Sequence, residues 1–306
     1  MKNDSNPFGA RLPGLADRVI LGLTTALPNN WAGLRLAILL RRAITTRLAK
    51  EGPEAALDVR RWGLAMRLHP LDNGCEKNLL FTPQMYEPEE LAELTKDIAA
   101  AGAEYRPFVF VDIGANVGLF SLFVAAKAGP TARILAIEPE PGNLARLTFN
   151  VTSNAGLQIR PIGLALGEEE GEVAITLNRR DRGGTRAQPL TANSAADVVR
   201  VPCRPLLTLL RMQDISYVDA LKIDVEGMED LVLAPFFRDA PPALWPKMIL
   251  IEDSRHEWRT DLFALFAARG WEIATRTKQN VVLRLKAQTN GTASDTTMAS
   301  RAMAQR

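Results

Sequence analysis

The sequence predicts an α/β fold built on a mostly parallel sheet of seven strands, and three observations support this prediction. First, residues 108–113 are apolar apart from Asp112, which is typical of a strand that is buried on both faces. Second, the glycine-containing turn 114–118 leads from this run into an apolar helical stretch, as in the first half of a βαβ unit. Third, further strand-like runs alternate with helical stretches, and the last two flank a short polar turn, as in an antiparallel hairpin.

The elements follow in order along the chain. The expected sheet strands are 108–113, 133–138, 158–166, 220–225, 247–253, 271–276 and 281–286. Between the third and fourth of these, 172–177 and 198–203 read as two further strands of a β-excursion that is inserted before the next helix. Residues 59–70 partly alternate and are consistent with another strand. The expected helices of this region are 89–101, 141–150 and 258–268.

A helical extension precedes the sheet. Two helices are expected between residues 15 and 50, separated by the turn 28–30. The stretch 31–44 places Leu34, Ile38 and Arg41 on one flank and ends in basic residues, which is consistent either with a membrane-surface or partner helix or with a helix packed on the main domain. The apolar moment favours packing. We therefore expect a helical N-terminal extension over 1–58, a main α/β domain over 59–286 and a disordered Thr- and Ser-rich tail over 287–306.

Composition excludes several classes of protein. Of the 306 residues, 47% are hydrophobic and 24% charged, which is typical of a globular chain. Residues 1–61 carry ten Lys/Arg and five Asp/Glu, so the basic character is confined to the N-terminal extension and a nucleic-acid partner is not indicated. Cys75 and Cys203 lack metal-site spacing, and the chain shows neither a signal peptide nor an 18-residue apolar run. These features favour a cytoplasmic protein.

The glycine turn indicates which ligand it binds. A dinucleotide loop needs glycines at its first, third and sixth positions, but the third is Asn116 and the closing glycine comes early, at Gly118. Asp112, two residues before Gly114, would repel a pyrophosphate and would suit an ammonium group. S-adenosylmethionine carries an ammonium, a sulfonium and a ribose but no phosphate. The turn therefore favours this cofactor over a nicotinamide dinucleotide or a nucleotide sugar.

A carboxylate follows at the distance expected for a ribose ligand. Glu138 ends the second predicted strand, 24 residues beyond Gly114, where its two oxygens can accept hydrogen bonds from a ribose diol. Glu140, two residues later, is more typical of the first turn of a helix. The predicted cofactor site comprises Asp112, Gly114, Asn116, Gly118 and Glu138.

The second candidate site lies in residues 220–227. Period-two alternation places Lys222 and Asp224 on the same side of a strand, where they either pair with each other or serve a site. Asp224 lies at the carboxyl end of that strand, which is where open α/β sheets bind their ligands. Another acid, Glu252, ends the next strand, and His256 follows it.

These motifs resemble the FkbM family of S-adenosylmethionine-dependent methyltransferases. The resemblance rests on Asp-Ile-Gly-Ala-Asn-Val-Gly at 112–118, Glu-Pro at 138–139, Lys-Ile-Asp-Val-Glu-Gly-Met-Glu at 222–229 and Ile-Glu at 251–252, and it covers about residues 75–285. It implies a Rossmann-like class I methyltransferase fold, O-methylation of a small metabolite, sugar or glycan, and roles for Asp224 and Glu226 near the methyl group or its acceptor. The family usually has an acid before the Lys-x-Asp motif, where this chain has 205–210 without one.

The residues leave the activation of the acceptor open. A hydroxyl needs a base within reach, and the candidates are Asp224, Glu226, Glu252 and His256, the last because histidine side chains ionise near neutrality. The three acids can alternatively gather a divalent metal ion, although no metal site is assigned. The arginines of 179–186 either clamp an anionic substrate or form a solvated hairpin. The alternative to an enzyme is a non-catalytic protein that binds the cofactor or a partner.

Overall fold

The computed structural model describes residues 6–178, 182, 186–188 and 198–286. Its centre is a seven-stranded sheet with the order β12-β13-β11-β10-β3-β4-β5. The five strands from β11 to β5 are parallel, and β13 runs antiparallel to both β11 and β12. This arrangement confirms the predicted fold class. The strands are β3 (Val109–Ile113), β4 (Arg133–Ile137), β5 (Ile159–Ile162), β10 (Ala220–Ile223), β11 (Met248–Glu252), β12 (Trp271–Arg276) and β13 (Asn280–Leu285).

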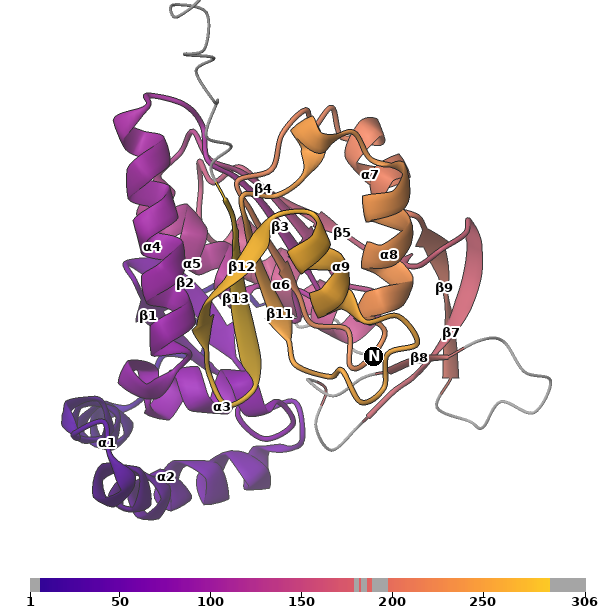
Figure 1. Ribbon diagram of the computed structural model, residues 1–306. Coiled ribbons are helices and arrows are strands. Elements are labelled where there is room, and N and C mark those ends of the chain that lie inside the picture. The colour runs from indigo at the N-terminus through magenta and orange to yellow at the C-terminus, as the bar shows by residue number, and fades with distance from the viewer. Residues whose placement is uncertain (1–5, 179–181, 183–185, 189–197, 287–306) are drawn as a thin grey trace, which may run out of the picture.

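Helices cover both faces of this sheet, which explains why its central strands are apolar throughout (Figure 1). On β3, Phe110 belongs to a core with α4, α5 and α6, whereas Val109 and Val111 belong to a second core with α7, α8 and α9. The alternation of side chains along a strand divides them in this way. The helices are α4 (Pro88–Ala103), α5 (Leu119–Ala128), α6 (Pro141–Thr152), α7 (Leu206–Met212), α8 (Glu229–Asp239) and α9 (Leu262–Ala268), with η3 (Pro242–Leu244) after α8.

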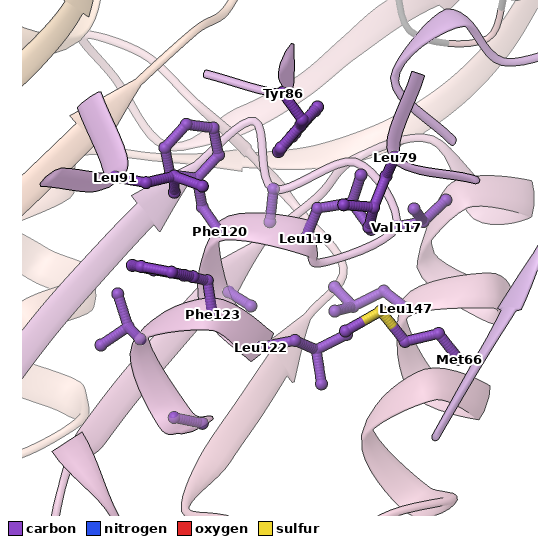
Figure 2. Packing of buried hydrophobic residues seen from close by; sticks show 14 of the residues in the cluster. Met66, Leu79, Tyr86, Leu91, Val117, Leu119, Phe120, Leu122, Phe123 and Leu147 are labelled. Atoms are coloured by element: carbon purple, nitrogen blue, oxygen red, sulfur yellow. The ribbon is translucent and has the colours of Figure 1, made fainter. Parts of the chain in front are cut away.

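Helix α5 is the centre of the first core. Figure 2 shows Leu119, Phe120, Leu122 and Phe123 pointing to different neighbours, with Tyr86 above Phe120. The ring centroids of Tyr86 and Phe120 lie 6.1 Å apart. Because nearly the whole helix is buried, its position relative to the glycine turn that precedes it is fixed by packing on every side.

The N-terminal region shares this core. Two helices, α1 (Leu15–Ala26) and α2 (Trp31–Glu51), precede a hairpin of β1 (Leu57–Arg61) and β2 (Leu64–Leu68), then α3 (Gly74–Phe81) and η1 (Pro83–Met85). Leu21, Ile44 and Leu48 are buried in the first core. The predicted helices of this region are confirmed, and α2 continues to Glu51. The predicted boundary after residue 58 falls inside β1.

A buried ion pair fixes the start of the chain to the hairpin. Both guanidinium contacts of Arg67 with Asp58 are 3.0 Å or shorter, and both side chains are buried. The second carboxylate oxygen of Asp58 also accepts the backbone N–H groups of Gly9 and Arg11. The expectation of a single strand over 59–70 is wrong, since the chain reverses at Trp62 and Gly63, both of which have positive φ.

The expected third strand is divided between two sheets. β5 ends at Ile162, and β6 (Ala165–Leu166) joins a separate sheet of order β6-β9-β7-β8. At the intervening Gly163 the chain passes close to α6, where a Cβ would lie 2.5 Å from the end of the Leu144 side chain. The predicted β-excursion is confirmed by β7 (Gly171–Thr176) and β9 (Val198–Arg204), and the sheet also contains β8 (Arg186–Gln188), which was not predicted.

The helix expected over 258–268 begins later, at Leu262, where the Asp261 side chain accepts the N–H of Ala264. Trp258 lies in the preceding loop. The tail 287–306, for which we predicted disorder, lies outside the described residues. No helix in the described ranges has both the length and the apolarity that crossing a bilayer requires.

Candidate active site

A cavity of about 370 Å³ lies at the carboxyl ends of β3, β4, β10 and β11. This is the point where the strand order reverses, with β4 on one side of β3 and β10 on the other. In an open α/β sheet, the connections leave such neighbouring strands in opposite directions, which opens a crevice for a ligand. Of the predicted site residues, the cavity is lined by Gly114, Asn116, Glu138, Asp224, Glu226 and Glu252.

Glu138 dominates one end of the cavity, which we call the nucleotide end. Its two carboxylate oxygens accept the backbone N–H groups of Asn116 and Glu140, at 2.8 and 2.9 Å. These bonds fix the plane of the carboxylate and leave lone pairs for a ligand. Burial raises the pKa of Glu138 to about 7, so the group ionises near neutral pH.

The Asn116 side chain is held by a residue that the sequence analysis did not identify. Asn116 has a φ of +53°, in the left-handed region that asparagine tolerates. Its side-chain oxygen accepts a hydrogen bond from Nδ2 of Asn73 at 2.8 Å, and the Asn73 oxygen caps α3 by accepting the N–H of Glu76. Helix α3 thus orients the cofactor loop. The only signal in the sequence was an Asn-Gly pair, which also fits a plain turn.

Asp112 and Gly118 stand behind the cavity rather than in its lining. Asp112 is completely buried; one carboxylate oxygen accepts the N–H and the hydroxyl of Ser121, and the other has no hydrogen-bond partner in the described structure. Burial raises its pKa, against the opposing effect of Lys222. A Cβ at Gly118 would lie 2.4 Å from Leu147, so this glycine allows α5 to pack on α6. The predicted ligand contact of Gly118 is not part of the observed lining.

Acidic side chains gather at the opposite end of the cavity, which we call the acid end. Lys222 Nζ lies 3.3 Å from Asp224 Oδ2 and 5.2 Å from the centre of the Phe120 ring. Burial opposes the charge on Lys222, but Asp224 and Asp112 raise its pKa above the ordinary value. The pairing proposed from strand alternation is therefore present, and Asp224 lines the cavity at the same time. Burial and the nearby Asp224 raise the pKa of Glu252.

The two halves of the site meet at Gly114. A Cβ at this position would lie 1.9 Å from the carbonyl oxygen of Asp224, and Gly114 has a φ of +72°. Any other residue would force β3 and β10 apart at their carboxyl ends. Gly114 is therefore required by the contact between the two motifs as well as by the turn.

Glu229 holds the second motif in place. Its side chain is fully buried, and Oε1 accepts the backbone N–H groups of Val225 and Gly227. Oε2 accepts the indole N–H of Trp258 at 2.6 Å. Glu226, between these two amides, has a φ of +58° and lines the cavity. The last acid of the 222–229 motif is thus a positioning residue, a role that the sequence analysis did not assign.

His256 is not brought to the cavity. Its side chain is 75% exposed, and its Nε2 lies 3.5 Å from Glu257. It is absent from the residues that line the cavity. The geometry therefore does not place the predicted histidine base within reach of a ligand that occupies the cavity.

A different acid reaches the cavity from outside the parallel sheet. Glu87 precedes α4 with a φ of +43°, lines the cavity, and accepts a hydrogen bond from Nδ2 of Asn280 at 3.1 Å. The same amide donates to Glu90 at 3.0 Å. Burial, with the carboxylates of Glu90 and Asp224, raises the pKa of Glu87 to about 7, while Lys222 acts in the opposite direction. No pattern in the sequence indicates Glu87, because it stands before Pro88, outside every periodic element.

A cluster of ion pairs closes the side of the cavity near α6. Arg146 bonds both oxygens of Asp72, at 2.9 and 2.7 Å, and Glu76 at 3.0 Å. Arg182 bonds Asp72 and Glu140 and lines the cavity. Arg182 is the only described member of 179–185, and its contacts with acids show that it is not simply solvated. The rest of the predicted arginine clamp lies outside the described residues, apart from the backbone of β8.

The described residues contain no group of three or more His, Cys, Asp or Glu side chains arranged to hold a metal ion. The carboxylates at the acid end therefore do not present a ready ligand set. The assignment of a divalent metal stays open, as the sequence left it.

Comparison with known proteins identifies a family for this architecture. Residues 112–268 match the model of the methyltransferase FkbM domain. The methyltransferase sdnD of Sordaria araneosa is 28% identical, over 54% of this chain and 82% of that protein. Among solved structures, the methyltransferase FkbM from Methylobacillus flagellatus has 18% identity and a TM-score of 0.33, over 69% of this chain and 52% of its own. M. jannaschii TYW2 in complex with AdoMet has 12% identity and a TM-score of 0.36, over 76% of this chain and 85% of its own.

Proposed function

Because the chain belongs to the FkbM methyltransferase family, we propose that it transfers a methyl group from S-adenosylmethionine to a hydroxyl of a small metabolite, sugar or glycan. One observation carries this proposal. The cavity has a nucleotide end at Glu138 and an acid end at Glu87 and Asp224, and the two ends meet at Gly114. A single cavity thus joins a place for a ribose to a group of potential bases.

The nucleotide end fits the proposed cofactor. Glu138 is oriented by two backbone amides and can accept from both hydroxyls of a ribose. Behind the loop, the unpartnered oxygen of Asp112 is a buried acceptor that calls for a donor, either directly or through a bridging water. When bound, S-adenosylmethionine supplies an electrophilic methyl group on a sulfonium. The donor is already activated, so the residues contribute mainly by positioning.

The acid end provides the proton acceptor that a hydroxyl needs. Two carboxylates line it from opposite sides, Glu87 from the start of α4 and Asp224 from the end of β10. Asp224 accepts a hydrogen bond from Lys222 Nζ at 3.3 Å, which holds its carboxylate where it can accept a further hydrogen bond that orients the acceptor. Glu87 ionises near neutrality and is suited to removing the proton. A negative acid end also disfavours acceptors that carry a phosphate or carboxylate.

A binding titration tests the cofactor assignment. We expect S-adenosylhomocysteine to bind with a saturable isotherm in calorimetry, and NAD not to bind. Glu138→Ala removes the ribose contact and should weaken binding at least about tenfold, as expected for losing hydrogen bonds to a charged group. Glu140→Gln is the control, because Glu140 lies two residues further along the chain and does not line the cavity. Unchanged affinity in Glu138→Ala would contradict the assignment.

An assay of methyl transfer distinguishes an enzyme from a non-catalytic protein that binds the cofactor. Labelled methyl groups should be transferred to acceptors in a metabolite or glycan extract, and Asp224→Ala should retain cofactor affinity while losing transfer. If the wild-type chain binds the cofactor but labels no acceptor class, the protein is a non-catalytic cofactor-binding protein and the proposed activity is wrong.

A further inference from the structure

Exposed apolar side chains are concentrated on the first two helices. Eleven large apolar side chains are exposed in the described part of the chain, and eight of them lie between Leu12 and Leu39. Such a concentration is unusual on a water-facing surface and marks a site of interaction. In Figure 1, both helices project at one corner of the molecule, away from the seven-stranded sheet.

Helix α1 presents an apolar side to water. Leu15, Val19 and Leu23 are spaced four residues apart, so they form one stripe along the helix, and each is more than half exposed. Among its polar residues, Thr24 is completely buried and Asp17 is bound to Arg47 of α2, whereas Arg18 and Thr25 are exposed. Leu21 is buried in the first core, so α1 is apolar on more than one side and the described protein leaves the stripe of Leu15, Val19 and Leu23 uncovered.

Helix α2 adds tryptophan, leucine and arginine to the same corner. Trp31 is 69% and Leu39 57% exposed. The Arg35 guanidinium lies 4.4 Å from the centre of the Trp31 ring. Arg42, one turn beyond Leu39, is exposed as well. The two helices pack against each other, so their exposed side chains belong to one part of the surface.

The charge of this corner is strongly positive. The two helices contain six Lys or Arg side chains and only two acids, Asp17 and Glu51. Both acids pair with Arg47. The other five cations, which are Arg18, Arg35, Arg41, Arg42 and Lys50, therefore meet no acid from within the two helices. The residues 62–286 that follow are net negative, because residues 1–61 have a balance of +5 and the whole chain only +2.

We propose that the α1–α2 pair docks on a membrane surface that contains anionic lipids. Leucine and tryptophan side chains enter the headgroup boundary, while arginines bind the headgroups, which is how interfacial helices with this composition associate with bilayers. A second copy of the chain fits less well. A symmetric contact would bring the same patch onto itself and set the arginines of one copy against those of the other.

Vesicle flotation of the full chain tests this proposal. We expect the protein to float with vesicles of phosphatidylcholine and phosphatidylglycerol, and much less with phosphatidylcholine alone or at high salt. Leu23→Glu combined with Leu39→Glu should reduce the partition coefficient at least about tenfold. Arg35→Gln and Arg42→Gln should each reduce it by about fivefold.

The matched control is Ile273→Glu, which places the same charge on an exposed apolar side chain of β12. It should not alter flotation. Since every substituted side chain is exposed, all variants should keep the wild-type circular dichroism, and flotation requires neither cofactor binding nor methyl transfer, so this test is independent of the proposed activity. Absence of flotation, flotation unaffected by the leucine variants, or a dimer in light scattering that those variants dissociate would each overturn the proposal.

Discussion

A single carboxyl group sets the pH behaviour that we expect of this site. Glu87 has a pKa raised to about 7 by burial and by the neighbouring acids Glu90 and Asp224, with Lys222 opposing them. A base must be unprotonated to act, so its contribution is lost as the pH falls below 7 and is complete above it. The pH dependence thus follows from the surroundings of one side chain.

We therefore predict that Glu87→Gln lowers kcat by about a hundredfold or more and removes the acidic limb of the pH–rate profile. The neighbouring Glu90→Gln is the informative comparison. It removes one of the negative charges that raise the pKa of Glu87, so activity should persist while the acidic limb moves to lower pH. Profiles of kcat against pH for the two variants provide the measurement. An acidic limb that survives in Glu87→Gln would assign the base to another group.

At the scale of the element, the turn after β10 depends on one buried acid. Glu229 accepts two backbone N–H groups and the indole of Trp258, so it joins the turn, α8 and the loop before α9. The φ of +58° at Glu226 persists because this framework surrounds it. The position of the acid end is therefore determined by contacts that lie outside the cavity.

We predict that Glu229→Gln lowers the free energy of unfolding by roughly 1–3 kcal/mol and reduces kcat. The reason is that the amide nitrogen of glutamine cannot accept the hydrogen bonds that Glu229 now receives. Denaturant unfolding and steady-state kinetics measure the two effects. Glu89→Gln is the control, because Glu89 is also an acid in the first turn of a helix but is exposed. Equal losses in both variants would show that the helix dipole, not the turn, explains the role of Glu229.

Sequence patterns located the elements whose burial is uniform and misjudged those that depend on distant contacts. The apolar runs that became β3 and β11 have neighbours on both faces, so the pattern alone defines them. In 158–166 the apolar pattern continues past Gly163, although the chain changes sheets there, where it passes close to α6. Trp258 fitted a helical period, yet its indole is required by Glu229 in a loop.

The residues of the candidate site divide in the same way: those at the ends of predicted strands were identified from the sequence, and those placed by tertiary packing were not. Glu138 and Asp224 end predicted parallel strands, so their meeting at one edge of the sheet followed from topology. Glu87 and Asn73 come from the region before the sheet and reach the site only through tertiary packing. His256 was kept as a candidate base for its chemistry, but nothing in the sequence showed that its loop turns the side chain toward solvent.

At the scale of the whole molecule, the N-terminal helices are part of the folding unit. Ile44 and Leu48 of α2 are completely buried in the core that also contains residues of α3 and α5. Asp58 and Arg67 of the hairpin add a second connection, because they bind backbone groups of residues 6–11. Removing the helices would expose part of α3. This helix orients Asn116 through its N-cap residue, Asn73.

We predict that the full chain unfolds in a single thermal transition and that deletion of residues 1–52 lowers its melting temperature by at least about 4 °C. Each buried leucine or isoleucine that is lost removes about 1.5–3 kcal/mol of apolar stabilisation, and about 1 kcal/mol shifts the midpoint of a chain of this size by roughly 2–4 °C. Scanning calorimetry is the measurement. Two separate transitions in the full chain, or an unchanged midpoint after the deletion, would instead indicate an independent N-terminal domain.

The contact between Gly114 and the carbonyl oxygen of Asp224 has a consequence for redesign. Position 114 accepts no side chain while the Asp224 carbonyl stays in place, since a Cβ there would lie 1.9 Å from that oxygen. Anyone who wishes to retarget the enzyme to a new acceptor should leave both untouched. Gln279 and Glu252 line the same cavity away from this contact, and they are the positions at which a combinatorial library can alter acceptor choice while conserving the shape of the shared backbone.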